Sequence, residues 1–70
     1  MTIDAILRQA PIRFADISLE LVLARLVGEI QPYVVWVHNP RTGDFAWGHY
    51  YATLADAEKG FAQRLAAYTA

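Results

Sequence analysis

The stretch Tyr33–Tyr51, YVVWVHNPRTGDFAWGHYY, decides the fold that this sequence predicts. Its two ends, Tyr33–His38 and Phe45–Tyr51, are rich in β-branched and aromatic residues, which is typical of strands. Between them, Pro40 presets φ for a turn, and Gly43 can take the left-handed conformation that returns the chain to an extended path. We therefore expect a β-hairpin with a four-residue loop.

A hairpin closed by the pair Asn39 and Asp44 fixes which side chains share a face, because side chains alternate along a strand. The face with small residues at its middle is assigned to the core, and it carries Tyr33, Val35, Val37, Ala46, Gly48 and Tyr50. The opposite, aromatic face carries Val34, Trp36, His38, Phe45, Trp47, His49 and Tyr51. A bulge at Gly48 would exchange the two faces beyond it.

Three interpretations of the aromatic face stay open at this point. The C-terminal helix could cover it and make it part of the core, since aromatic residues dominate core burial in small domains. It could instead meet a partner protein or a second copy, because Trp and Tyr are enriched at interface hot spots. A platform for stacked nucleic-acid bases is the third interpretation, and it is disfavoured because only Arg41 among the basic residues lies nearby.

Outside the hairpin, three segments have the spacing of amphipathic helices. The first is Thr2–Gln9, and the second is Leu19–Ile30, whose apolar residues recur on one face and which is expected to pack on the hairpin. The third follows Thr53, a predicted helix cap, and runs close to the C-terminus. Gly60 within it predicts close packing against another element, because glycine costs a helix roughly 1 kcal/mol relative to alanine. We expect one domain over residues 1–70, an α+β fold of order α-α-β-β-α with the hairpin packed on helices.

Composition excludes several classes of protein. The chain has 70 residues, 56% of them hydrophobic, a net charge of −1 and no cysteine. Disulfides, thiolate catalysis and cysteine–zinc sites are therefore excluded. The near-neutral charge argues against both a basic nucleic-acid module and an acidic DNA mimic. The start lacks the basic region of a signal peptide, and no apolar run is long enough to span a bilayer, so we expect a cytoplasmic protein.

The sequence contains no recognisable catalytic or metal-binding constellation. Ser18 is the only serine, and it is placed at a predicted helix start. His38 and His49 are the only histidines, and the predicted register puts them roughly 13 Å apart, too far for one zinc ion. The seven carboxylates are spread along the chain with no pair at catalytic spacing. We expect no enzymatic activity, no cofactor and no metal site.

The second half of the chain resembles a group of known proteins. It contains WVHNPRTG at Trp36–Gly43, WGHY at Trp47–Tyr50 and TLADA at Thr53–Ala57. These runs are similar to those of small uncharacterised accessory proteins of bacterial phages, plasmids and integrative elements. Such proteins share a Trp-containing strand, an Asn-Pro-x-Thr-Gly turn, a Trp-Gly-His-Tyr strand and a Thr-Leu-x-x-Ala helix start. The Trp-Gly-His-Tyr run is the most specific part of the resemblance.

The resemblance implies a non-catalytic inhibitor of anti-CRISPR type. Such a protein would bind a bacterial host protein or ribonucleoprotein complex and block it sterically or conformationally, without imitating DNA. The expected partner-binding residues are Trp36, His38, Arg41, Phe45, Trp47, His49 and Tyr51. The alternative is a small dimeric nucleic-acid-associated regulator or antitoxin-like protein, and a homodimer is left open in either case. Salt separates the two, because phosphate contacts weaken steeply as salt rises and an apolar interface does not.

Overall fold

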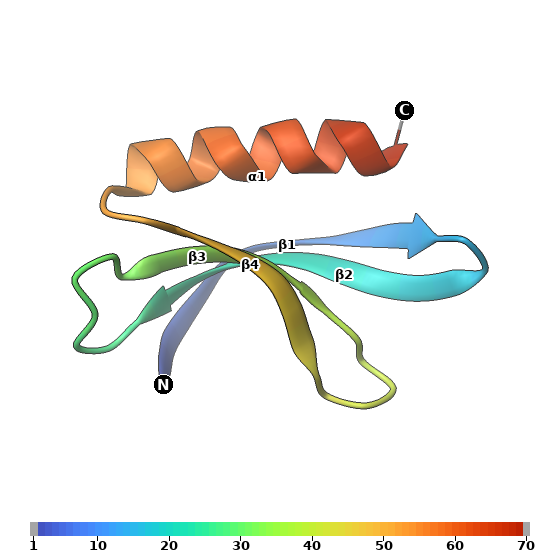
Figure 1. The fold of residues 1–70 in the computed structure, drawn as a ribbon, viewed down its shortest axis with the longest axis horizontal. Coiled ribbons are helices and arrows are strands. Elements are labelled where there is room, and N and C mark those ends of the chain that lie inside the picture. The colour runs from blue at the N-terminus through green and yellow to red at the C-terminus, as the bar shows by residue number, and fades with distance from the viewer. Residues whose placement is uncertain (1, 70) are drawn as a thin grey trace.

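The computed structural model describes residues 2–69 as a four-stranded antiparallel sheet with one helix packed on it (Figure 1). The strands lie in the order β1-β2-β3-β4, so each strand pairs with its neighbours in sequence. The elements are β1 (Ile3–Phe14), β2 (Ile17–Leu26), β3 (Tyr33–His38), β4 (Phe45–Tyr51) and α1 (Leu54–Thr69). The expected order α-α-β-β-α is wrong, because both N-terminal segments are strands and the order is β-β-β-β-α.

The helix expected over Leu19–Ile30 is the central strand β2, which is buried on both faces. One face packs under α1 and contributes Leu19, Leu21 and Leu23 to the core. The other face contributes Val22, Ala24 and Leu26 to a second cluster of buried residues. A strand buried on both faces has a nearly continuous apolar sequence, so its apolar residues also fit a helical spacing.

The helix expected over Thr2–Gln9 belongs to the edge strand β1. Its pairing with β2 shifts register between Ile3 and Ala5 and again between Ile6 and Arg8. These irregularities interrupt the two-residue alternation and leave apolar residues at helix-like intervals. Pro11 also lies in β1, which an edge strand tolerates because one side of it needs no hydrogen-bond donor.

The turn between β1 and β2 has only two residues, Ala15 and Asp16, between the paired residues Phe14 and Ile17. Ala15 has φ of 55°, in the left-handed region. Positive φ at the first central residue is what a tight type II′ hairpin turn requires, and glycine is preferred there. This tight turn joins the two strands directly where the sequence predicted the approach to a helix.

The β3–β4 hairpin turn and the start of α1 are confirmed. The amide of Asn39 donates to the Asp44 carbonyl at 2.9 Å, and Gly43 has φ of 80°. The Thr53 Oγ1 accepts a hydrogen bond from the Asp56 amide at 3.2 Å, as expected of a helix cap. The turn and cap residues therefore form the local structures that their sequence predicts.

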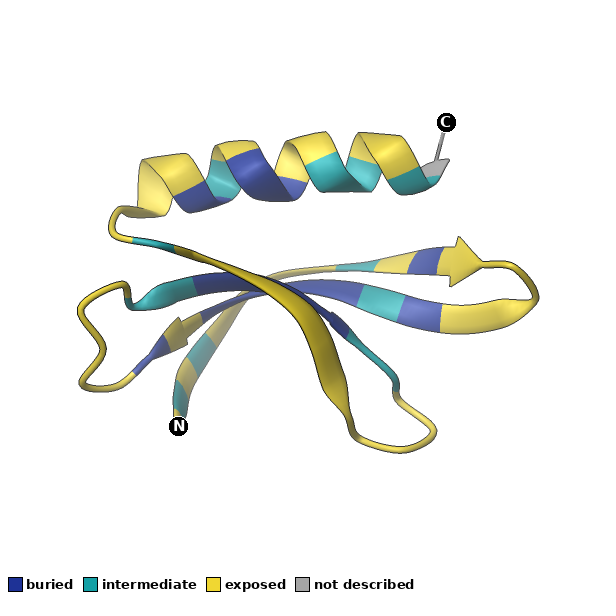
Figure 2. Ribbon diagram, in the orientation of Figure 1, coloured by how far each residue is buried: buried dark blue, intermediate teal, exposed yellow. Residues whose placement is uncertain are grey.

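The main core lies between α1 and the face of the sheet beneath it. Ala57 and Phe61 of α1 pack there against side chains of β1, β2 and β3. Figure 2 shows this buried band, and it shows β4 exposed along nearly its whole length. Within residues 2–69, α1 is too short and too polar to cross a membrane as a helix.

Candidate functional site

The pairing of β3 with β4 changes register at its middle. His38 pairs with Phe45 and Val37 with Ala46, as the sequence predicts. Beyond them the register shifts, and Val35 pairs with His49, where the predicted partner was Gly48. Trp47 lies at this bulge with φ of 57°, a rare conformation for a bulky residue. The bulge that the sequence allowed as an alternative at Gly48 is therefore present. The β4 residues that follow it lie on the opposite faces from those predicted.

Arg64 of α1 binds the main chain at this bulge. Its Nη1 lies 2.9 Å from the Val35 carbonyl oxygen and 2.8 Å from the Trp47 carbonyl oxygen, and donates to both. A bulge disrupts the regular ladder of main-chain hydrogen bonds, so carbonyls there need another donor. The Arg64 guanidinium supplies that donor and ties α1 to the irregular part of β4.

The predicted aromatic face is only partly assembled. Trp36, Phe45 and His38 form a continuous stack, which we call the aromatic ladder. The ring centroids of Trp36 and Phe45 are 4.3 Å apart, and those of His38 and Phe45 are 4.6 Å apart. Aromatic pairs at these separations stabilise each other beyond the area that they bury.

The other four predicted site residues lie elsewhere. Trp47 contacts Phe14 with a centroid separation of 5.8 Å, and His49 lies on the α1 side of the sheet opposite Val35. Tyr51 packs against the core beneath α1, and Arg41 lies in the β3–β4 turn, where its amide donates to the Asn39 side chain. The expectation of one face carrying all these residues is therefore wrong, because the bulge separates Trp47, His49 and Tyr51 from the ladder.

The side of the sheet that faces away from α1 is apolar, and we call it the open face. Five of its residues are buried, namely Val22, Ala24, Leu26, Val34 and Trp36, with Ile3 packed against them. In Figure 1 the strongly twisted sheet brings the N-terminal end of β1 and the β3–β4 turn to this side, while α1 lies on the other. The C-terminal helix, which one of the three interpretations placed over the aromatic residues, therefore lies on the opposite side of the sheet from the ladder.

Trp36 carries an unusual polar group within this cluster. Its side chain is only 8% exposed, and within residues 2–69 its indole Nε1 has no hydrogen-bond acceptor. A buried donor without an acceptor costs about 1–3 kcal/mol relative to a satisfied one. Such groups are rare in folded proteins, so this N–H is a cost that the packing of the cluster must outweigh.

Glu20 and Gln9 form a hydrogen-bonded pair beside the aromatic ladder, and Glu20 contacts its outer ring, His38. Glu20 on β2 lies opposite His38, and its Oε1 is 2.9 Å from the His38 Nδ1. Gln9 on β1 donates to the other oxygen of Glu20 at 2.7 Å. The hydrogen bond with His38, and then that from Gln9, lower the pKa of the Glu20 carboxyl below its ordinary value of 4.5. These contacts orient His38 against Phe45, and the sequence missed Gln9 and Glu20 because it placed both on helices.

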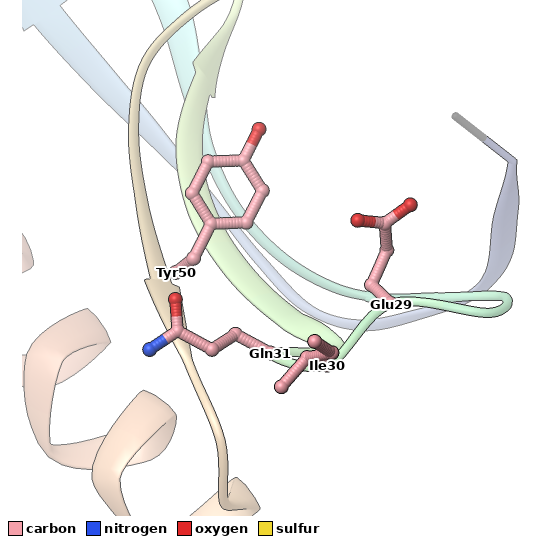
Figure 3. Close-up of a pocket in the computed structure, with 4 residues that line it drawn as sticks. All are labelled: Glu29, Ile30, Gln31 and Tyr50. Carbon is pink, nitrogen blue, oxygen red and sulfur yellow. The ribbon is translucent and has the colours of Figure 1, made fainter.

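Two hollows lie outside the aromatic ladder. A groove of about 340 Å³ lies at the end of the sheet where β1 turns into β2, and its apolar lining includes Phe14, Ile17 and Trp47. A second hollow, of about 510 Å³, is lined by Glu29, Ile30 and Gln31 of the β2–β3 loop and by Tyr50 of β4 (Figure 3). The sequence pointed to neither, because each hollow includes residues in β2 or in the loop that follows it, and β2 was expected to be a helix.

Across residues 2–69, no three His, Cys, Asp or Glu residues are grouped so that they could hold a metal ion. Comparison with protein-family models, with curated proteins and with solved structures found no match to this chain. What the protein does is therefore argued from its own surfaces.

Proposed function

We propose that this protein is a non-catalytic binding protein that inhibits a bacterial macromolecular complex. In this proposal the open face and the aromatic ladder dock on a protein surface of that complex and block it sterically or conformationally. The observation that carries the proposal is the ladder itself, a stack of three rings at the margin of an apolar face that α1 leaves uncovered.

Exposed apolar side chains around the buried part of the open face support a protein partner. Ile6, Phe45 and Tyr50 are 46%, 37% and 39% exposed, and each pairs with a residue of that face, namely Ala24, His38 and Val34. Contiguous apolar patches with polar margins mark interaction sites on small proteins. The margin here is Gln9, Glu20 and His38, linked by hydrogen bonds.

Charge supports a protein surface over a nucleic acid as the partner. The chain has six Lys and Arg residues and a net charge of −1. Arg8 and Arg25 pair with the carboxylates of Glu58 and Asp4, and Arg64 binds main-chain carbonyls. Half of the cations are thus engaged within the fold, and phosphate binding depends mostly on the number of available Lys and Arg side chains.

A pull-down with matched phenylalanine variants tests the proposal. Phe45 and Phe14 are 37% and 52% exposed, but only Phe45 belongs to the ladder. The tagged wild type, Phe45→Ala and Phe14→Ala are incubated with nuclease-treated bacterial lysate at low and moderate salt. We expect the wild type to capture a stoichiometric complex that survives nuclease and salt. Phe45→Ala should weaken this binding roughly tenfold or more, and Phe14→Ala should leave it unchanged. The captured complex should also lose activity when purified wild-type protein is added.

Two results would contradict this function. Loss of all captured material on nuclease or salt treatment would favour a nucleic-acid-associated regulator. Equal binding by wild type and Phe45→Ala would remove the ladder from the interface. Phe45 is preferred over Trp36 for this test, because truncating a buried tryptophan costs about 3–5 kcal/mol and could unfold so small a domain.

A further inference from the structure

The strand β4 is an exposed edge of the sheet. It pairs with β3 on one side, and in the part of the chain that the structure describes no strand pairs with its other side. Residues 45–50 are all exposed, which Figure 2 shows along the strand. An edge strand presents a row of main-chain N–H and C=O groups that can pair with another strand.

The two edges of the sheet differ in how they are protected. The outer strand β1 contains Pro11, the charged residues Asp4, Arg8 and Arg13, and two register irregularities. Proline, charged side chains and bulges are the devices by which proteins prevent edge pairing. In contrast, β4 has the sequence FAWGHYY, with no proline and no Asp, Glu, Lys or Arg, and its one irregularity lies at Trp47. The residues that follow the bulge therefore form the unprotected part of the edge.

We propose that β4 pairs antiparallel with β4 of a second copy about a two-fold axis at His49, which joins two domains into one eight-stranded sheet. A second copy is the fitting occupant because it brings a strand of the same exposed, uncharged kind, and the net charge of −1 causes little repulsion between copies. A domain of this size also buries little surface by itself, and oligomerisation is a common remedy.

The faces of the strand and the small size of Gly48 together select the register. Residues paired across a two-fold axis perpendicular to the sheet must lie on the same face, which allows an axis at a residue such as His49 or Tyr50 but excludes one between them. With the axis at His49, Gly48 lies opposite Tyr50 of the second copy. Gly48 and Tyr50 are both on the open-face side, since the Cβ direction of Gly48 points toward Val34, Tyr50 and Trp36. Glycine leaves room for an aromatic ring from the neighbouring strand, a pairing that stabilises sheets.

Molecular mass in solution gives the first test. Analytical ultracentrifugation of the wild type at about 100 µM should give a molecular mass twice the 7.9 kDa of one chain. At that concentration a dimer with a micromolar Kd is almost fully formed. His49→Lys should halve that mass, because it places two like charges directly opposite each other across the axis. Ser18→Lys, at another exposed strand position away from β4, should remain dimeric. Circular dichroism and urea unfolding confirm that both variants are folded.

Cysteine cross-linking gives a second test that is specific for the register. The chain has no cysteine, so a His49→Cys variant can form only an intermolecular disulfide. Opposite residues of antiparallel strands have Cα atoms about 4.5–5.5 Å apart, within disulfide range. Oxidation of His49→Cys should yield the covalent dimer roughly tenfold faster than oxidation of Ser18→Cys, because pairing raises the effective concentration of the thiols.

Three outcomes would overturn the proposal: a wild type that is monomeric at about 100 µM, a dimer that His49→Lys leaves unchanged, or equal cross-linking rates for the two cysteine variants. The pairing uses the main-chain edge of β4, and of the open-face side it involves Gly48 and Tyr50 but no residue of the aromatic ladder. A failed dimer test therefore leaves the proposed inhibitor function standing, and a failed pull-down leaves the dimer standing.

Discussion

Gly60→Ala is the substitution for which the structure makes its sharpest prediction, because two effects of opposite sign compete at this position. Gly60 is buried in the middle of α1. In an unobstructed helix, alanine would stabilise the fold by about 1 kcal/mol relative to glycine. An added Cβ, however, would lie 2.6 Å from Cζ of Tyr51, with the phenol oxygen closer still. Overpacking of this kind costs about 1–3 kcal/mol, so the net result is a loss of about 1 kcal/mol.

Removing the obstructing ring should reverse the sign. In a Tyr51→Leu background the added methyl group meets no phenol, and Gly60→Ala should then stabilise by about 1 kcal/mol. Urea unfolding followed by circular dichroism measures the free energy of unfolding of all four proteins, and a change of 1 kcal/mol shifts Tm by about 4–8 °C in a domain this small. If Gly60→Ala stabilises both backgrounds equally, the close approach of α1 to Tyr51 does not exist.

Three further perturbations follow from single features of the fold. Ala15→Gly should raise the free energy of unfolding by about 0.5–1 kcal/mol, because it relieves a left-handed alanine in the β1–β2 turn, and a lower Tm would exclude that turn. Arg64→Met should lower the free energy of unfolding by about 1–2 kcal/mol, because two carbonyls at the bulge lose their charged donor, whereas unchanged urea unfolding would mean that these hydrogen bonds contribute nothing. The pKa of Glu20 is lowered in the folded protein, so its pairing with His38 stabilises the fold at pH values above the ordinary pKa of 4.5. That contribution to the free energy of unfolding is lost progressively as the pH falls through the lower pKa of the folded state. Urea unfolding from pH 7 to pH 3 should therefore show the difference between wild type and Glu20→Gln shrinking in acid, and a constant difference would contradict the pairing.

The segments that the sequence predicted correctly are those governed by local chemistry. The β3–β4 hairpin depends on turn residues such as Gly43, and the start of α1 depends on the Thr53 cap, both of which act within a few residues. The expected close packing at Gly60 is also confirmed. In each case one residue has a strong conformational or hydrogen-bonding preference that the structure uses at that position.

The N-terminal half was predicted wrongly because its strands conceal the two-residue period. The strand β2 is buried on both faces from Leu21 to Ala24, so apolar residues are continuous there. In β1, irregular pairing leaves Ile3, Ile6 and Leu7 at helix-like intervals. Both effects arise from pairing between strands distant in sequence, which a local pattern does not encode.

The bulge at Trp47, which the sequence raised at Gly48 only as an alternative to a regular hairpin, connects most of the features described above. A regular hairpin would put Tyr51 on the same face as Trp36, where it could not lie beneath α1. The shift in register turns Tyr51 toward the helix, and there its ring occupies the space that Gly60 leaves free. The glycine in α1 and the bulge in β4 therefore require each other, and Arg64 fixes both by binding the Trp47 carbonyl. The same shift removes Trp47, His49 and Tyr51 from the ladder, and it puts Gly48 and Tyr50 on the open-face side of the free edge, where the proposed pairing of two β4 strands uses them.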